Sequence, residues 1–159
     1  MTLAQSSRRP SPWLVLALVC IPVFVGALDL TIVSAFLPEI IVNLQLPIET
    51  IVDDAAWIVT GYLLAYTVSM TFMGRVSDLI GRRTAFVICL VIFTLGSFIV
   101  AEVDPTARTG AARIVYDLLF RATGERPDPG QAALIAIIVG RVVQALGAGA
   151  LVPVSLALV

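Results

Sequence analysis

Four long apolar stretches constrain this chain more than any other feature of its sequence. A helix needs about 20 mostly apolar residues to cross the hydrocarbon core of a bilayer, and each stretch is of about that length. A membrane β-barrel would instead show alternating strands of roughly ten residues. The sequence therefore predicts an all-α, multi-pass transmembrane helical bundle. The four predicted spans are residues 13–37, 55–73, 84–101 and 132–159, preceded by a tail of residues 1–12.

The composition supports a membrane protein and excludes several other classes. Of the 159 residues, 59% are hydrophobic and 13% are charged, and the mean hydropathy is +1.02. Soluble domains contain about 45–50% apolar and about 25% charged residues. The chain has no histidine, which removes imidazole acid–base catalysis and imidazole metal sites. A net charge of −1 gives no broad attraction to nucleic acid. We therefore expect a non-enzymatic protein without a metal or cofactor, whose partner is the lipid bilayer and not nucleic acid.

The placement of arginine between the spans predicts the orientation in the membrane. Short loops that carry arginine or lysine usually face the cytoplasm. The segment 39–54 has four acids and no arginine, whereas the segment 74–83 has three arginines against one aspartate. We therefore expect residues 1–12 and 74–83 on the cytoplasmic side of the plasma (inner) membrane. The segments 39–54 and 102–131 would then be extracytoplasmic.

The long segment 102–131 contains a periodic pattern of charge. Arg113, Asp117 and Arg121 recur every four residues, so they would share one face of a helix. This pattern fits an amphipathic helix at the membrane interface. It equally fits a partly ordered loop in which the periodicity arose by chance.

Three polar side chains inside the predicted spans are candidates for function. Asp29 interrupts the first span, and Arg141 and Gln144 lie in the fourth. Ionisable groups at such positions usually face a partner or a water-filled path. At a rise of 1.5 Å per residue, Asp29 lies about 13 Å from Pro38 and Arg141 about 14 Å from Ala132, which are the expected outer ends of their helices. An Asp29–Arg141 pair would form where these helices touch. Otherwise Arg141 would pair with Gln144, a backbone carbonyl or another helix, and Asp29 would be an acid reached by water near the outer interface.

Four short sequence motifs follow one another along the chain, one in each of three predicted spans and one between the second and third spans. They are LDLTIVSAFLP at 28–38, WIVTGYLLA at 57–65, GRVSDLIGRR at 74–83 and RVVQALGAG at 141–149. Together they resemble the N-terminal part of a major facilitator superfamily transporter, closest to the fourteen-helix drug:proton antiporters. The resemblance implies that the chain forms the first four helices of that fold.

The resemblance also implies a function. It indicates a secondary active transporter that exports small amphiphilic or drug-like compounds in exchange for protons, with the proton gradient as driving force. A uniporter or symporter for a nutrient or metabolite is the alternative within transport. A non-transporting membrane fragment or scaffold is the alternative from another class. The implied partners are a small-molecule substrate and, for a fragment, the rest of the transporter.

Roles for individual residues follow from the same resemblance. Arg141 would take part in proton coupling, with Asp29 in coupling or substrate binding and Gln144 beside them. Gly147 and Gly149 are small residues that permit close helix packing. Two features depart from the family pattern, namely Leu79 where arginine is usual and an insertion of about 20 residues within 102–131. The expected conformational-switch loop consists of Gly74, Arg75, Asp78, Gly81, Arg82 and Arg83.

Overall fold

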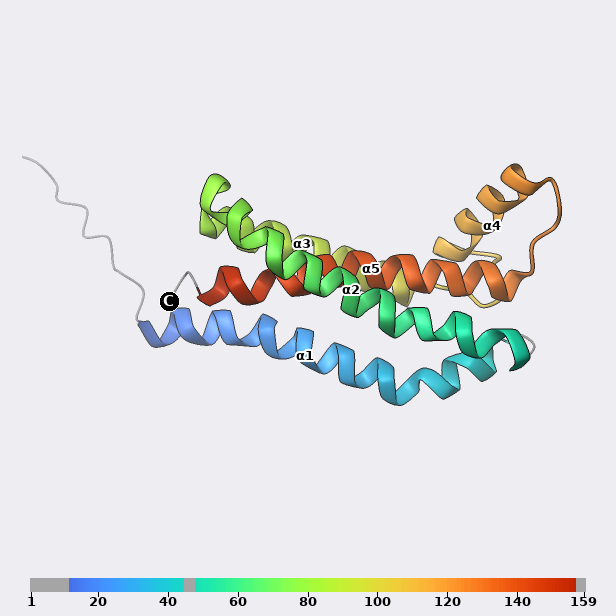
Figure 1. Cartoon of the computed structure of the whole chain (residues 1–159), viewed down its shortest axis with the longest axis horizontal. Helices are drawn as coiled ribbons and strands as arrows, with labels where there is room; N and C mark the ends of the chain where they lie inside the picture. Colours follow the sequence, from blue (N-terminus) through green and yellow to red (C-terminus); the bar gives the residue numbers. More distant parts are fainter. Residues whose placement is uncertain (1–11, 45–47, 157–159) are drawn as a thin grey trace, which may run out of the picture.

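The computed structural model of the chain describes residues 12–44 and 48–156 (Figure 1). Every regular element in these ranges is a helix, which confirms the predicted all-α class. Residues 1–11 of the predicted tail and residues 157–159 of the fourth predicted span lie outside the described residues. The helices are α1 Pro12–Asn43, α2 Ile48–Ile80, α3 Arg82–Ala101, α4 Gly110–Thr123 and α5 Pro129–Leu156.

Four of the described helices, α1, α2, α3 and α5, are long and apolar enough to cross a membrane. They run in alternating directions (Figure 1). The start of α1, the α2–α3 junction and the end of α5 therefore lie at one end of the bundle, and α4 lies at the other. This arrangement is the helical bundle that the sequence predicted.

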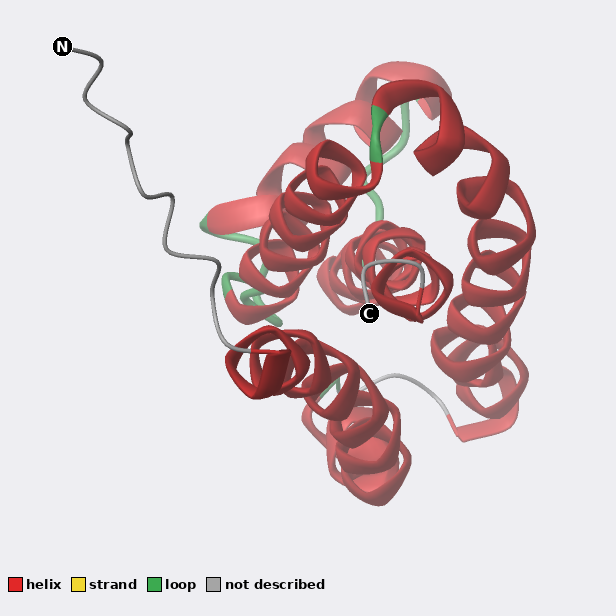
Figure 2. Cartoon of the chain, turned by 90° about the vertical axis from the view of Figure 1, so that its left-hand side faces the viewer, coloured by secondary structure: helices red, strands yellow, loops and turns green. Residues whose placement is uncertain are grey.

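The centre of the bundle is α5, which is surrounded by α1, α2 and α3 (Figure 2). Of the most apolar part of each span, 61% is buried in α5 but only 6% in α1. Small residues on α5 allow this close approach. A Cβ atom at Gly147 would meet backbone atoms of Phe93 and Cys89 on α3, and one at Gly149 would meet the backbone of Tyr66 on α2.

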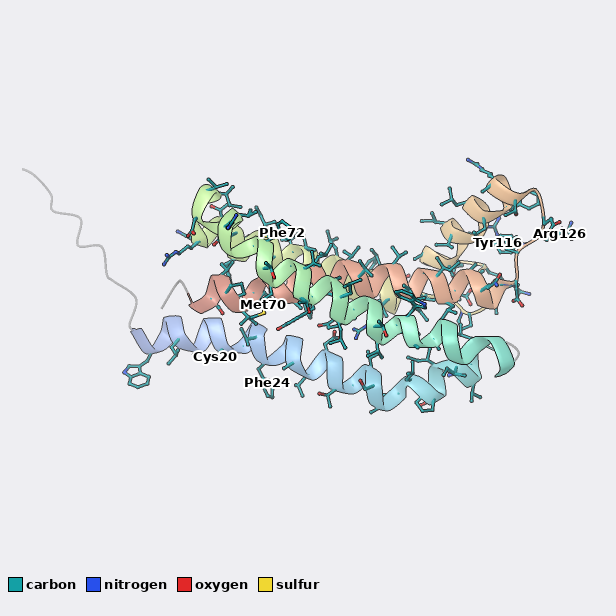
Figure 3. The ribbon with its side chains drawn as sticks, viewed as in Figure 1. Cys20, Phe24, Met70, Phe72, Tyr116 and Arg126 are labelled. Carbon is teal, nitrogen blue, oxygen red and sulfur yellow. The ribbon has the colours of Figure 1, made fainter. Side chains whose placement is uncertain are left out.

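The outward faces of the surrounding helices remain apolar. Phe24 on α1 is 63% exposed and points away from α5 (Figure 3), and Phe72 on α2 is 67% exposed. Apolar side chains on the outside of a bundle suit contact with lipid. The high share of apolar residues in the composition is therefore found on the outer surface of the bundle as well as in its core.

The helices extend beyond the predicted spans, which corrects two expectations. Pro38 does not end the first helix, because α1 continues to Asn43. The segment 74–83 is not a loop, because α2 runs to Ile80 and α3 begins at Arg82. Only Gly81 lies between them, with φ of 88°, a conformation that glycine adopts without steric cost. Hydropathy marks the part of a helix that suits hydrocarbon, whereas backbone hydrogen bonding continues past that boundary.

The segment 102–131 contains a helix, so the helical interpretation of its charge pattern is the right one. On α4, Arg113 Nε lies 3.2 Å from Asp117 Oδ2. The helix ends at Gly124, whose φ of 74° is left-handed and whose amide donates to the Phe120 carbonyl at 2.9 Å. Such a glycine is a common helix terminator. The insertion is thus a folded element at one end of the bundle.

Candidate functional site

A polar cluster inside the bundle joins all four long helices. Asp29 comes from α1, Tyr62 from α2, Ser97 from α3, and Arg141 and Gln144 from α5. Polar groups within a membrane span are costly unless they find partners. The contacts within this cluster therefore decide which charges the bundle can hold.

The centre of the cluster is an ion pair between α1 and α5. Arg141 Nη1 donates to Asp29 Oδ2 at 2.7 Å. The Arg141 side chain is 2% exposed and that of Asp29 is 18% exposed. Measured along the longer helices, Asp29 lies about 21 Å from the end of α1 and Arg141 about 18 Å from the start of α5. The two residues are therefore at similar depth, as the sequence predicted, and the structure brings them into contact.

Gln144 completes this ion pair and connects it to α3. Its Oε1 accepts from Arg141 Nη1 at 2.7 Å, and its Nε2 donates to Asp29 Oδ1 at 3.0 Å. The same Nε2 donates to Ser97 Oγ at 2.8 Å. Residues three apart share a helix face, which places Gln144 beside Arg141 on α5. Pairing of Arg141 with Asp29 and pairing with Gln144 were separate hypotheses at the level of sequence, and the structure contains both.

The flat face of the guanidinium lies on an aromatic ring. Arg141 Cζ is 4.4 Å from the centroid of the Tyr62 ring, a cation–π contact. The Tyr62 ring stacks in turn with that of Tyr66 at 6.1 Å between centroids. Within the described chain, Arg141 Nε and Nη2 are buried without a hydrogen-bond partner. Arg141 is therefore neutralised by Asp29 but keeps two donors for which the bundle provides no acceptor.

A cavity of about 220 Å³ adjoins the cluster between α1 and α2. Gly26 and Ala27 lie less than one turn before Asp29, and Tyr66 lies one turn after Tyr62. The cavity thus extends from the level of the cluster toward the end of the bundle that holds the α2–α3 junction. Its lining consists of Gly26, Ala27, Tyr62, Leu63 and Tyr66.

The expected conformational-switch residues lie at that end of the bundle, well away from the polar cluster. Asp78 Oδ1 lies 4.0 Å from Arg82 Nη2 across the α2–α3 junction, and both side chains are more than half exposed. Exposed pairs of this kind contribute about 0–1 kcal/mol. Arg75 and Arg83 are also exposed, and Gly74 lies within α2. The structure therefore separates the predicted residues into two sites.

Sequence reasoning missed two members of the cluster, Tyr62 and Ser97. Tyr62 belongs to the stretch 57–65, but an aromatic residue in an apolar span gives no sign of its partner. Ser97 is a single hydroxyl in the apolar span 84–101. A Cβ atom at the neighbouring Gly96 would overlap the backbone of Gln144. A small residue next to a polar one in an apolar helix was therefore the sequence signal that could have found Ser97.

A bundle of apolar helices that encloses a charged pair at mid-depth is the construction of a polytopic membrane transport protein. The family model of the Major Facilitator Superfamily matches residues 19–159. The chain therefore belongs to the Major Facilitator Superfamily, a transporter class and not an enzyme class. No solved structure matches the chain.

Curated relatives of the chain are named as transporters. It is 33% identical over 147 residues to the acurin A biosynthesis cluster MFS-type transporter of Aspergillus aculeatus, covering 92% of this chain and 21% of the relative. It is 32% identical over 151 residues to a triacylglyceride transporter of Mycolicibacterium hassiacum, covering 95% and 23%. It is 31% identical over 112 residues to the riboflavin transporter RibZ of Clostridioides difficile, covering 70% and 23%. The chain thus spans less than a quarter of the length of these relatives, whose names do not single out the drug:proton antiporter subgroup.

Proposed function

We propose that this chain forms the first four spans of a secondary active transporter of the plasma membrane, with a cytoplasmic N-terminus, which exports small amphiphilic compounds in exchange for protons. The proton gradient is the driving force, and no cofactor takes part. The observation that carries this proposal is the contact of Asp29 with both Arg141 and Gln144. The drug:proton antiporters are the subgroup that fits this activity.

Proton binding and the ion pair exclude each other in this cluster. A proton on Asp29 removes the charge that neutralises Arg141, and the guanidinium is permanently charged. The protonated state therefore leaves Arg141 with an unbalanced charge, which favours a different arrangement of α1 and α5. Two states that differ in proton affinity are what coupling requires.

The cavity beside the cluster supports a route for the proton. Asp29 keeps 18% of its side chain exposed, whereas Arg141 keeps 2%. The cavity leads from this level toward the end of the bundle that carries Arg75, Arg82 and Arg83, which the charge rule places in the cytoplasm. A proton would then reach Asp29 from the cytoplasmic side.

The cavity lining and the relatives both support an amphiphilic substrate. Apart from the tyrosine hydroxyls, the cavity is lined by apolar and aromatic side chains, which suit an amphiphilic molecule. A triacylglyceride transporter is among the relatives. The ring of Tyr66 at the cavity wall and the likeness to a riboflavin transporter favour a second candidate, a carrier of a planar nutrient.

The test is pH-driven substrate efflux from vesicles that contain the full-length protein, with Asp29→Asn compared to the parent. We expect the variant to insert and express normally and to lose efflux that depends on the pH gradient. Glu39→Gln is the matched control, because Glu39 is an exposed acid on the same helix. Normal pH-dependent efflux by Asp29→Asn would remove Asp29 from the mechanism. A full-length parent without any flux would favour the non-transporting alternative.

A further inference from the structure

The helix α4 lies outside the bundle core and packs against it with one face only. Ala112 is fully buried, and Val115 and Leu119 pack against a buried cluster that includes Ala133 and Ala136 of α5. The helix projects sideways on the α3 side of the bundle (Figures 1 and 2). Most of its circumference is therefore not covered by the described chain.

The face opposite the protein contact is charged. Arg113, Asp117 and Arg121 follow one another at intervals of four residues, and all three are exposed. The pair of Arg113 with Asp117 leaves Arg121 without a carboxylate partner on this face. The face carries a net positive charge, which attracts phosphate groups.

An exposed apolar strip separates the charged face from the protein-facing side. It consists of Ile114, which is 72% exposed, and Leu118, which is 66% exposed. At 3.6 residues per turn, these two side chains lie one above the other. Two adjacent exposed side chains of this size gain hydrophobic stabilisation when lipid or protein covers them.

We propose that α4 is an interfacial helix that rests on the edge of the lipid bilayer. Ile114 and Leu118 enter the boundary between headgroups and acyl chains, and the face of Arg113 and Arg121 meets the lipid phosphates. Helices with charged and apolar faces bind membranes in this way. The described chain places α4 at the end of a span, where such a boundary must lie.

The apolar strip continues an exposed apolar surface of α3. The last two turns of α3 expose Leu95 by 54% and Phe98 by 63%, and α3 contacts α4. A span of this length and composition suits acyl chains along its outward side. Because α4 leaves the bundle on this same side, a bilayer that covers Phe98 would also reach its apolar strip. This continuity favours lipid over a protein partner as the occupant.

The test is fluorescence quenching in proteoliposomes made with the full-length protein, in which its native tryptophans, including Trp13 and Trp57, are replaced by phenylalanine. One tryptophan is then introduced, by Leu118→Trp or by Ile114→Trp. We expect blue-shifted emission that is quenched by lipids brominated on their acyl chains and protected from aqueous iodide. Asp117→Trp, one position away on the charged face, should show the reverse preference. Val91→Trp, on the exposed mid-part of α3, is the positive control for lipid contact.

Two results would overturn the proposal. Quenching of the tryptophans at 114 and 118 by iodide would place the strip in water. Protection from both quenchers, while Val91→Trp responds to brominated lipid, would mean that protein covers the strip. Because the readout is fluorescence, it does not depend on whether the protein transports anything.

Discussion

Ser97 on α3 accepts a hydrogen bond from Gln144 on α5, with 2.8 Å between Ser97 Oγ and Gln144 Nε2. The same amide nitrogen lies 3.0 Å from the carboxylate of Asp29. Ser97 therefore holds the group that orients Asp29, although it contacts neither charge of the ion pair. A hydroxyl in an otherwise apolar span thus takes part in positioning the charged centre.

Replacement of Ser97 by alanine tests this role. Hydrogen bonds between membrane helices contribute about 0.6 kcal/mol on average, so we expect Ser97→Ala to lower the free energy of unfolding by roughly that amount. Thr94→Val is the matched control, because its hydroxyl donates to Leu90 of the same helix. Unfolding in mixed micelles measures both variants. Equal losses of unfolding free energy in the two variants would mean that the Ser97 hydroxyl contributes no more than a hydroxyl bonded within its own helix.

The ion pair predicts strong coupling between Asp29 and Arg141. Removing one partner of a buried pair costs about 3–5 kcal/mol, because the other charge is left without compensation. The double variant of Asp29→Asn with Arg141→Gln should therefore lose much less than the sum of the two single variants.

The control cycle uses the exposed pair of Arg113 and Asp117 on α4. Its coupling should be about 0.3–0.5 kcal/mol, as for exposed pairs one turn apart. Unfolding in mixed micelles supplies all the free energies. Additive losses at Asp29 and Arg141 would contradict an energetically coupled pair.

Close packing of α3 on α5 predicts opposite effects of alanine at two glycines. A Cβ atom at Gly96 would overlap backbone atoms of Gln144, whereas one at Gly74 would meet nothing within 4 Å beyond the backbone of its own helix turn. Gly96→Ala should destabilise the bundle by about 1–3 kcal/mol through overpacking. Gly74→Ala should be neutral or stabilising by up to about 1 kcal/mol, because alanine favours helix. Thermal unfolding in detergent compares them, and a tolerated Gly96→Ala would show that the two helices are less tightly packed.

The turn before α4 predicts a pH dependence. Hydrogen bonds from Thr106, with a weaker one from Thr109, lower the pKa of Asp104 below its usual value. The charged form is favoured by the fold, so the turn is held at neutral pH and released as pH falls through the lowered pKa. A carboxyl-carbon NMR titration should show a low midpoint that Thr106→Ala raises. Thr123→Ala, at the far end of α4, should leave the midpoint where it was.

The predicted orientation can be tested with single cysteines at the two ends of the bundle. The background removes Cys20 and Cys89 and any other cysteine of the full-length protein. Glu125→Cys should react with a membrane-impermeant thiol reagent in intact cells, and Leu79→Cys should not. Both positions are exposed, so access to reagent depends on the side of the membrane. Labelling at Leu79→Cys alone would invert the orientation.

The fold could be predicted because the bilayer leaves few alternatives. Apolar stretches of spanning length must be helices, and a lone charge within them must find a partner, so an Asp29–Arg141 pair was one of the hypotheses that the sequence offered. The ends of the helices could not be predicted, since hydropathy gives no signal at Asn43 or Ile80, where α1 and α2 end. The contacts of Tyr62 and Ser97 depend on how helices rotate against one another. That rotation is set by packing between residues distant in the chain, which a single sequence does not show.

The junction at Gly81 has a mechanical consequence. One non-helical residue separates α2 from α3, and Asp78 and Arg82 face each other across it. A connection of one residue keeps the adjoining ends of α2 and α3 close together, so one end cannot be displaced far without the other. Tyr62 on α2 contacts Arg141 of α5, and Ser97 on α3 is hydrogen-bonded to Gln144 of α5. A displacement of the exposed Asp78–Arg82 end would therefore move both helices that hold the polar cluster, α2 through Tyr62 on Arg141 and α3 through Ser97 on Gln144.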